Sequence, residues 1–318
     1  MVHAENLTKT FVVHRKAGLI RRRPVTVRAV EGISFDIEAG EMVGYIGPNG
    51  AGKSTTVKML TGLLYPTAGS VRVAGLEPAR QRKALARQIG VVFGQRRQLL
   101  WDLPLLASLD LFRHVYRIPA ERYRHNLDTF VELLELQPFL ETPVRQLSLG
   151  QVMRGELAAT LVHDPEVLFL DEPTIGLDVV SKGRVLDFLA TMNRERGTTM
   201  LMTTHDVADL ERLCQRMLII DHGHLIYDGT MPGLRRRMGT ERTLVVDLER
   251  PQPALSIAGA ETISVDGRRQ RLRFHRDRTS AASLIAEVAR SAPVADLAVE
   301  EVPIEDIVRR IYVSGLEG

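Results

Sequence analysis

One stretch, residues 47–55, constrains the possible folds of this chain more than any other. It reads GPNGAGKST and matches the pattern G-x-x-x-x-G-K-S. An apolar run, 42–46, precedes it and a helix-compatible segment, 56–64, follows, so strand, loop and helix stand in the required order. Such a loop turns its backbone N–H groups inward, and the helix adds its positive end. We therefore predict a polyphosphate-binding loop and disfavour the alternative of a glycine-rich turn without a ligand; its residues are Gly47, Pro48, Asn49, Gly50, Ala51, Gly52, Lys53, Ser54 and Thr55.

Chemical roles follow for two residues of this loop and for two carboxylates elsewhere. Lys53 can reach the outer phosphates, and the Ser54 hydroxyl can ligate Mg²⁺. The apolar run 167–170 ends in Asp171 and Glu172. Alone, that run indicates a buried parallel strand. The pair of acids at its end predicts that Asp171 holds Mg²⁺ through water and that Glu172 orients or deprotonates an attacking water.

Other candidate residues have two interpretations each. Gln95 ends a short apolar strand, where its amide oxygen can approach a bound Mg²⁺. Ser148 opens a helix either as an N-cap, with Gln151 completing a capping box, or as a second anion site for a γ-phosphate. His205 follows the apolar strand 198–203 and can hydrogen-bond a γ-phosphate, although a lone histidine is usually structural. Phe11 either stacks on an adenine ring or ends a strand in the core.

The composition sets wider limits. A chain of 318 residues suggests about two domains. No uncharged run reaches the roughly 18 apolar residues of a spanning helix, so we expect any work at a membrane to go through a partner. The first residues resemble no signal peptide, which favours a cytosolic location. Cys214 is alone in the sequence, which excludes an internal disulfide, and we expect it to be buried.

The formal charge of +3 is unevenly distributed. Three segments gather the basic residues: Arg15, Lys16, Arg21, Arg22, Arg23 and Arg28; then Arg80, Arg82, Lys83 and Arg87; then Arg235 to Arg237. These basic clusters could contact nucleic acid or an anionic membrane face, but a solvated surface is the commoner explanation.

The first domain is expected to mix strands and helices. Strands are predicted at 1–11 and 29–37 with the basic insertion 15–28 between them, and a basic helix at 78–88. From 103 to 136 the periodicity is helical. Trp101 stands before this region, either as a packed core residue, which we favour, or as an exposed anchor for a partner.

Taken together, the ordered motifs resemble the nucleotide-binding subunit of ATP-binding-cassette (ABC) transporters over residues 2–233. They are GPNGAGKST, Gln95, LSLGQ, VLFLDEP, GLD and TTHD. The resemblance implies an α/β P-loop NTPase fold, with a RecA-like mostly parallel sheet, antiparallel strands and an inserted helical subdomain at about 103–163. It also implies ATP and Mg²⁺ as ligands. The metal would be held by Ser54, Gln95 and Asp171, with Glu172 as general base and His205 contacting the γ-phosphate.

The same resemblance implies partners. Two copies would lie head to tail with ATP between them, so that Ser148, Gly150 and Gln151 of one copy touch nucleotide on the other, and Asp178 would face the opposite subunit. The homodimer would drive separate integral membrane permeases from the cytoplasmic face. Leu149 departs from the family pattern, which has a glycine there, and Val152 stands where a polar residue is common. We expect activity to be retained with altered packing.

Residues 234–318 predict a small α+β domain without a cluster of titratable residues. It resembles the appended domain of exporter-type ATPase subunits for drugs and polymers, which favours export of an amphipathic or hydrophobic molecule. The rival interpretation is a soluble ABC ATPase acting on ribosomes or nucleic acid. Neither a second cassette, nor a long coiled coil, nor a zinc cluster is visible in the sequence, so we expect no nucleic-acid partner.

Overall fold

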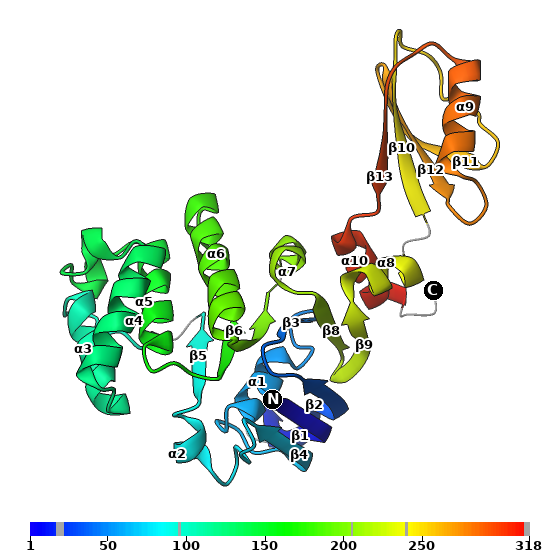
Figure 1. Cartoon of the computed structure of the whole chain (residues 1–318). Helices are drawn as coiled ribbons and strands as arrows, with labels where there is room; N and C mark the ends of the chain where they lie inside the picture. Colours follow the sequence, from blue (N-terminus) through cyan, green and yellow to red (C-terminus); the bar gives the residue numbers. More distant parts are fainter. Residues whose placement is uncertain (17–21, 95–96, 205, 239–240, 315–318) are drawn as a thin grey trace. The chain divides into compact units, whose positions relative to one another are not determined.

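The computed structural model describes residues 1–16, 22–94, 97–204, 206–238 and 241–314. The chain divides into two compact units, Met1–Gly229 and Thr230–Gly318 (Figure 1). Each unit has its own hydrophobic core. The boundary expected from the sequence, after residue 233, falls inside a helix of the second unit, Met231–Met238.

The first unit is built on a six-stranded sheet in the order β5-β6-β7-β3-β8-β9. The pairs β5/β6, β6/β7, β7/β3 and β3/β8 are all parallel. The carboxyl ends of these parallel strands, β5, β6, β7, β3 and β8, therefore meet at one edge. The full sheet consists of β3 (Met42–Ile46), β5 (Ile89–Phe93), β6 (Val167–Asp171), β7 (Thr199–Thr203), β8 (Arg216–Asp221) and β9 (His224–Thr230).

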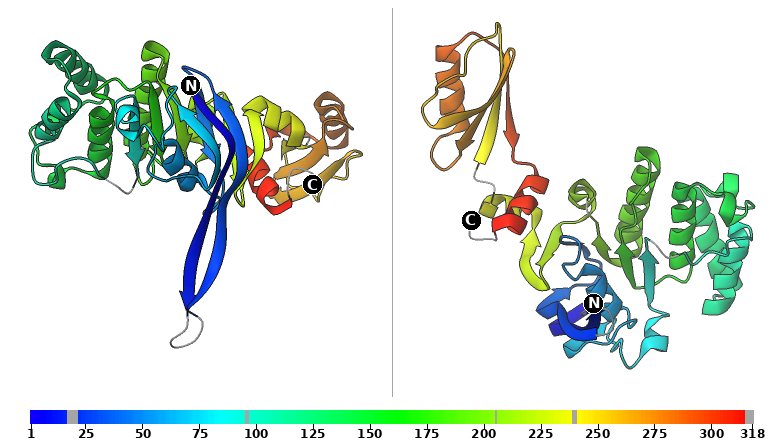
Figure 2. Two further views of the ribbon diagram at one scale, coloured as in Figure 1. Left: turned by 90° about the horizontal axis from the view of Figure 1, so that it is seen from below. Right: turned by 180° about the vertical axis from the view of Figure 1, so that it is seen from behind.

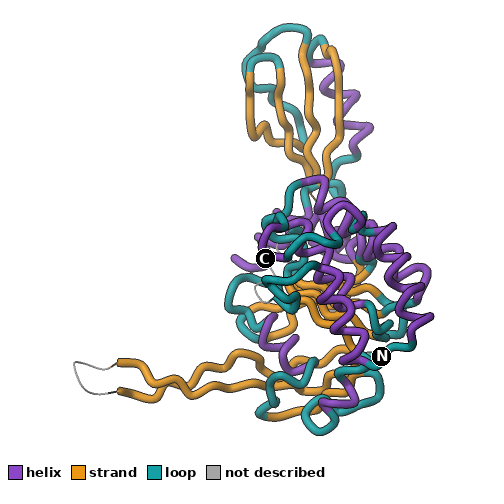
Figure 3. The backbone as a smooth tube through the Cα atoms, turned by 90° about the vertical axis from the view of Figure 1, so that its left-hand side faces the viewer, coloured by secondary structure: helices purple, strands orange, loops and turns teal. Residues whose placement is uncertain are grey.

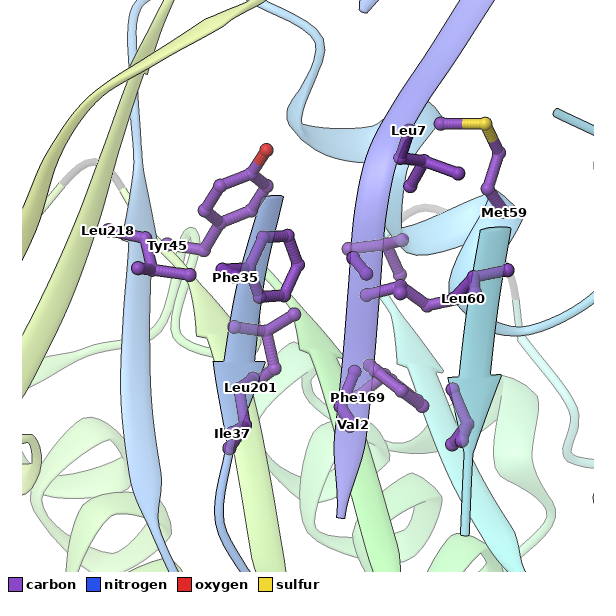
Figure 4. Packing of buried hydrophobic residues seen from close by; sticks show 14 of the residues in the cluster. Val2, Leu7, Phe35, Ile37, Tyr45, Met59, Leu60, Phe169, Leu201 and Leu218 are labelled. Carbon is purple, nitrogen blue, oxygen red and sulfur yellow. The ribbon is translucent and has the colours of Figure 1, made fainter. Parts of the chain in front are cut away.

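A second, three-stranded antiparallel sheet has the order β2-β1-β4. Its strands are β1 (Val2–Lys16), β2 (Arg22–Ile37) and β4 (Ala68–Val73). Helix α1 (Lys53–Leu60) contacts β2 and β4 of this sheet and also β6 of the large one. Residues of both sheets and of α1 form one core, in which Phe35, Tyr45 and Phe169 are buried together (Figure 4). The phosphate loop is thus held between two packed layers.

Helices complete the first unit. Helix α5 packs on β5, α3 packs on α5, and α6 packs on both α5 and α7. Pro119 and Pro143 precede α4 and a short 3₁₀ turn, where a fixed φ suits a helix start. The helices are α2 (Arg82–Leu85), α3 (Leu105–Tyr116), α4 (Ala120–Leu133), α5 (Leu149–Leu161), α6 (Val179–Arg196) and α7 (Val207–Leu213), with 3₁₀ turns η1 (Gln137–Phe139) and η2 (Val144–Gln146).

Three sequence expectations about this unit were wrong. The basic insertion is largely strand: β1 runs on to Lys16 and pairs with β2 from Arg22 (Figures 2 and 3). The basic helix at 78–88 shrinks to the single turn of α2. Trp101 is 49 % exposed, with the Arg97 guanidinium 4.8 Å from its ring centre, so a cation–π contact replaces core packing. Cys214 is buried, as expected, and burial raises its pKa to about 12.

The second unit is an antiparallel sheet with helices. Its strand order is β11-β12-β10-β13, and α9 packs against β13 while α10 contacts α8. Leu244, Val246 and Phe274 of the sheet share a core with Leu284 and Val288 of α9. The elements are α8 (Met231–Met238), β10 (Glu241–Leu248), β11 (Ala260–Asp266), β12 (Arg269–His275), α9 (Ala281–Ser291), β13 (Val294–Glu301) and α10 (Ile304–Ser314).

Over the described parts of both units, none of the helices combines the length and the apolar character that a membrane span requires.

Candidate functional site

The phosphate loop connects β3 to α1 in the way its sequence predicts. Gly52 is the residue before α1 and has φ 111°, and a Cβ there would lie 2.4 Å from the Ala29 carbonyl oxygen. Only glycine fits both conditions. The loop also closes on itself, because the Ala51 N–H donates to the Pro48 carbonyl at 3.1 Å. The first turn of an α-helix lacks intrahelical partners for its amide groups, and these favour an anion at the start of α1.

Lys53 is buried at the start of α1. Its Nζ donates to the carbonyl oxygens of Gly47 at 2.6 Å and Pro48 at 3.1 Å. Desolvation lowers the pKa of Lys53, while the charges of Glu172 and Asp171 act against that change. The ammonium group is thus held inside the loop, near the carboxylates of Asp171, which ends β6, and Glu172, which follows it.

A hydroxyl and a carboxylate converge beside this lysine. Ser54 Oγ donates to Asp171 Oδ2 at 3.2 Å, and Thr203 Oγ1 at the end of β7 donates to Asp171 Oδ1 at 2.6 Å. Oxygen donors of these types suit Mg²⁺, which binds through one or two carboxylates and completes its shell with waters and substrate phosphates. Among the described residues, no group of three or more His, Cys, Asp or Glu could hold a metal ion.

Glu172 occupies an unusual backbone position. Its φ is 56°, in the left-handed region that non-glycine residues rarely adopt. Its N–H donates to the Thr203 carbonyl at 3.0 Å and lies 3.1 Å from Thr203 Oγ1. Strain of this kind persists where neighbouring structure fixes it, and it is typical of functional sites. Thr203 therefore positions both acids at once.

Register brings four strand ends together. Phe93 of β5 lies beside Asp171, Asp171 beside Thr203, and Thr203 beside Tyr45 of β3. In open parallel sheets, ligands bind outside this carboxyl edge. Gln95 and His205, expected at the same edge, lie outside the described residues. The strands that lead to them, β5 and β7, do end there.

The signature segment LSLGQ begins α5, and the capping-box interpretation is confirmed. Ser148 Oγ accepts from the Gln151 N–H at 3.3 Å, and Gln151 Oε1 accepts from the Ser148 N–H at 2.8 Å. Gly150 is buried, and a Cβ on it would lie 2.4 Å from Ser181 Oγ of α6. The side chain of Leu149 lies beside Gly176 and is largely exposed. Ser148 is also exposed at the helix start, where an anion would find favourable donors.

Asp178 caps the next helix, α6. Its carboxylate accepts from the Ser181 hydroxyl at 2.6 Å and from the N–H groups of Val180 and Ser181 at 3.0 Å. The hydrogen bond from the Ser181 side chain is the main cause of the lowered pKa of Asp178. Ser181 also occupies the space that a side chain at Gly150 would need, so the LSLGQ segment and this aspartate lie against the same serine.

Phe11 is not a core residue. It lies half-buried on β1, opposite Val27 of β2, with Lys9 Nζ 5.2 Å from its ring centre. One face of its ring is therefore near a cation, and the core interpretation is wrong.

Sequence reasoning missed two residues that organise the edge. Thr203 contacts both acids, and Lys182 of α6 forms ion pairs with Asp206 and, at 2.8 Å, with Asp209. Asp209 in turn accepts from Thr174 Oγ1 at 2.8 Å. A threonine ending a strand beside an acidic pair is a usable signal, whereas the Lys182 pairing joins distant segments. A cleft of about 260 Å³ lies among these groups, lined by Glu172, Thr174, Ile175, Gly176, Leu177, Lys182, Thr204 and Asp206.

Comparisons with known proteins agree with this geometry. Residues 30–175 match the family model described as "ABC transporter". The daunorubicin resistance ATP-binding protein DrrA3 of Streptomyces coeruleorubidus is 36 % identical over 73 % of this chain and 72 % of its own length. A Nod factor export ATP-binding protein I of Burkholderia orbicola is 38 % identical over 71 % of this chain and 73 % of its own.

Two further likenesses extend the comparison. DrrA2 of Streptomyces coeruleorubidus, another daunorubicin resistance ATP-binding protein, is 32 % identical over 92 % of this chain and 89 % of its own length, so the likeness reaches into the second unit. Among solved structures, the dimeric ATP-binding cassette MJ0796 in a post-hydrolysis state with ADP and Pi is 27 % identical, covering 73 % of this chain and 99 % of that one, with a TM-score of 0.63. With the strand-edge site and the matching motifs, these relatives show that the chain belongs to the ABC transporter family, as an ATP-binding subunit that resembles those of exporters.

Proposed function

We propose that this chain binds and hydrolyses ATP, dimerises with a second copy around ATP, and thereby drives separate membrane permeases. The observation that carries the proposal is the convergence of Lys53, Ser54, Asp171 and Glu172 at one strand edge. A buried ammonium, a hydroxyl and two carboxylates beside a helix N-terminus are the groups that phosphoryl transfer to water requires.

Phosphate binding would use the loop and the start of α1. Lys53 Nζ now donates to the carbonyls of Gly47 and Pro48, and these contacts hold it over the concave side of the loop. A triphosphate in the loop would replace these two carbonyl oxygens as the acceptor for Lys53 Nζ, while the N–H groups from Gly50 to Thr55 would surround the β-phosphate. Phe11, which lies on the β1–β2 hairpin, would stack on the adenine ring.

Metal binding would use Ser54 and Asp171, with Gln95 as a further ligand. Ser54 Oγ and Asp171 Oδ2 already lie 3.2 Å apart. When bound, Mg²⁺ supplies positive charge to the phosphate oxygens. The Thr203 hydroxyl keeps the Asp171 carboxylate oriented toward Ser54. Asp171 would thus need no rearrangement to act as a ligand.

Water activation would fall to Glu172. The strained backbone at this residue, fixed by Thr203, holds its side chain at the edge beyond Asp171. A carboxylate placed there can accept a proton from water as it attacks the γ-phosphate, and His205 would contact the transferred group. Loss of such a base typically costs about 10²–10⁴-fold in rate.

Dimerisation would complete the site. Ser148, Gly150 and Gln151 of one copy would contact the nucleotide of the other, with Asp178 at the interface. The exposed aliphatic side chains around these residues support a protein interface: Leu149, Ile175, Val179 and Val180. The solved cassette MJ0796 is itself dimeric.

Coupling to a permease would use the helical region at the cytoplasmic face of the membrane. Trp101, Leu103, Leu111 and Val115 are all exposed there, and exposed aromatic and aliphatic groups mark a partner surface. The relatives' names refer to daunorubicin resistance and Nod factor export. We infer export of an amphipathic or hydrophobic molecule on that basis. The test is co-purification of the tagged chain from gently solubilised membranes: polytopic permeases in near-equal amounts support transport, and ribosomes or nucleic acid in their place contradict it.

Replacing the base tests the enzymatic part. Glu172→Gln should lower steady-state ATPase activity about 100-fold or more and trap an ATP-bound dimer on size-exclusion chromatography. Glu166→Gln is the matched control, because Glu166 is exposed just before β6, at the other end of that strand. A Glu172→Gln protein that stays monomeric in ATP, or hydrolyses at the wild-type rate, would contradict this role.

A further inference from the structure

Beyond Phe11, which is proposed to stack on adenine, the β1–β2 hairpin has no use in the proposed ATPase cycle. We call residues 12–16 of β1 and 22–28 of β2 the outer hairpin. Strand β4 pairs with β1 only as far as Thr8, so beyond that point the sheet has two strands and continues as a ribbon (Figures 2 and 3). An isolated two-stranded ribbon is marginally stable in water. A ribbon of this length therefore indicates an external surface that covers it.

Register divides the outer hairpin into two unlike faces. Partners run without interruption from Thr10↔Arg28 to Lys16↔Arg22. Directly paired residues share a face, and successive pairs alternate. Val13, Val25, Val27 and Arg23 lie on one face. Val12, Thr26, Pro24 and Arg28 lie on the other. We call the first the valine face.

The valine face is apolar and uncovered. Val13 is 45 % exposed and Val27 is 37 % exposed, while Val25 is half-buried. Strand residues of this kind normally face a core. Here three valines lead outward to the exposed Arg23, so the face is amphipathic along its length.

Charge is the second observation. The sequence contains no Asp or Glu from residue 6 to residue 30. The same stretch of sequence holds the basic residues Arg15, Lys16, Arg21, Arg22, Arg23 and Arg28. Arg28 has a nearby carboxylate, Glu31, at 3.4 Å, but this pair is exposed and weak. The sequence of the outer hairpin thus concentrates positive charge, which an anionic partner would complement.

We propose that the outer hairpin binds the surface of an anionic lipid bilayer, with the valine face in the headgroup region and its basic residues on lipid phosphates. Apolar residues flanked by Lys and Arg are the composition of interfacial membrane segments, and anionic lipids attract such clusters. The valines argue for lipid over nucleic acid, because single strands are bound chiefly by stacking on aromatic rings, and residues 12–28 contain no Phe, Tyr or Trp. Binding of this kind is independent of ATP turnover.

Vesicle binding tests the charge. The full chain should co-sediment with vesicles of equal parts phosphatidylglycerol and phosphatidylcholine, and not with phosphatidylcholine alone. Arg23→Glu with Arg28→Glu should weaken that binding by at least about tenfold, since each basic residue near an anionic surface contributes several-fold. The matched control is Arg82→Glu with Lys83→Glu, which reverses two exposed charges on α2. Equal losses in both variants, or equal binding to neutral vesicles, would overturn the proposal.

A face-specific probe tests the apolar contact. Cys214 is buried, so an environment-sensitive dye can be attached selectively at Val13→Cys or, on the opposite face, at Val12→Cys. Val12 is the more exposed of the two, at 64 %. We expect anionic vesicles to shift the emission of the dye at residue 13 to the blue and to leave the dye at residue 12 nearly unchanged. Equal responses would overturn the assignment of the valine face.

A third comparison separates lipid from other anions. Val13→Thr with Val25→Thr and Val27→Thr keeps β-branched residues and the full charge but removes the apolar face. This variant should lose vesicle binding more than a Val12→Thr variant does. Each protein is first shown to bind ATP normally, so that failure of the nucleotide site is detected separately. If wild type binds single-stranded RNA more tightly than anionic vesicles, or if the triple variant binds vesicles like wild type, the proposal fails.

Discussion

At the scale of single residues, Thr203 is the centre of the candidate site. It is fully buried at the end of β7, donates to Asp171 Oδ1 at 2.6 Å and supports the strained backbone of Glu172 through two contacts. Both acids are thus hydrogen-bonded to the same neighbour. The acids supply the chemistry, and the threonine sets where that chemistry occurs.

Removing the hydroxyl tests this positioning role. Thr203→Val keeps the shape of the side chain, so we expect kcat to fall about tenfold, equivalent to roughly 1.4 kcal/mol, with a smaller change in the KM for ATP. Thr199→Val is the control: Thr199 is buried on the same strand, and its hydroxyl accepts from the Gly40 N–H at the far end. Steady-state kinetics of both variants decide the point, and a similar fall in kcat for Thr199→Val would refute a specific role.

His163 gives a prediction about pH. Its ring stacks on Tyr116 with centres 3.8 Å apart, and desolvation lowers its pKa to about 4. In the unfolded chain a histidine titrates near pH 6.5. Between these two values the unfolded state binds a proton that the folded state does not, so stability falls as the pH decreases through this window.

We therefore expect His163→Gln to remove part of the acid sensitivity. The difference in unfolding free energy between wild type and variant should change by ~1–3 kcal/mol from pH 7 to pH 4.5, a range discounted for partial solvent access. Urea unfolding at each pH measures it. Parallel pH curves for the two proteins would show that His163 titrates normally.

At the scale of elements, Ser148 has two roles at the start of α5. Ser148 completes a capping box with Gln151 and also stands exposed where a γ-phosphate would bind. Ser148→Ala should cost about 1 kcal/mol of stability as well as ATPase activity, because the cap is lost. Ser148→Asp keeps an N-cap acceptor but places a negative charge at the proposed anion site, so stability should be kept within about 0.5 kcal/mol while ATPase activity falls.

The matched control for the two Ser148 variants lies in the second unit. Ser280 caps α9, where its hydroxyl accepts from the Ser283 N–H at 3.1 Å. Ser280→Ala should lose stability as Ser148→Ala does and keep ATPase activity. Thermal unfolding and ATPase assays measure both properties. Normal ATPase activity in Ser148→Asp would remove this serine from the nucleotide site.

Elements differ in how far local sequence predicts them. The phosphate loop and the acids after β6 were predictable, because each depends on residues adjacent in the chain. The outer hairpin was not: its alternating apolar residues are interrupted by charges, and its pairing joins Val13 to Val25, which lie twelve residues apart in the sequence. Strand β11 was also missed, since its Ile263 and Val265 are exposed and give no buried pattern. Lys182 and Asp209 meet only through tertiary packing.

At the scale of the whole molecule, the two units have separate cores. The first gathers residues of two sheets and α1, and the second gathers residues of β10, β12 and α9 (Figure 4 shows the first). All the candidate site residues belong to the first unit. A ligand that binds only one folded unit stabilises that unit by mass action, so ATP should act on the first core alone.

The last prediction follows from this separation. Leu244→Ala in the core of the second unit should destabilise that unit by about 2–5 kcal/mol, because a fully buried leucine leaves a cavity. Nucleotide affinity should not change. Calorimetry should then show two unfolding transitions. ATP should raise the midpoint temperature of the first unit's transition only, and Leu244→Ala should lower that of the second unit only. Leu201→Ala, in the core beside the site, is the comparison and should lower the other transition and weaken ATP binding. A single transition, shifted together by ATP and by Leu244→Ala, would mean that the two units unfold as one.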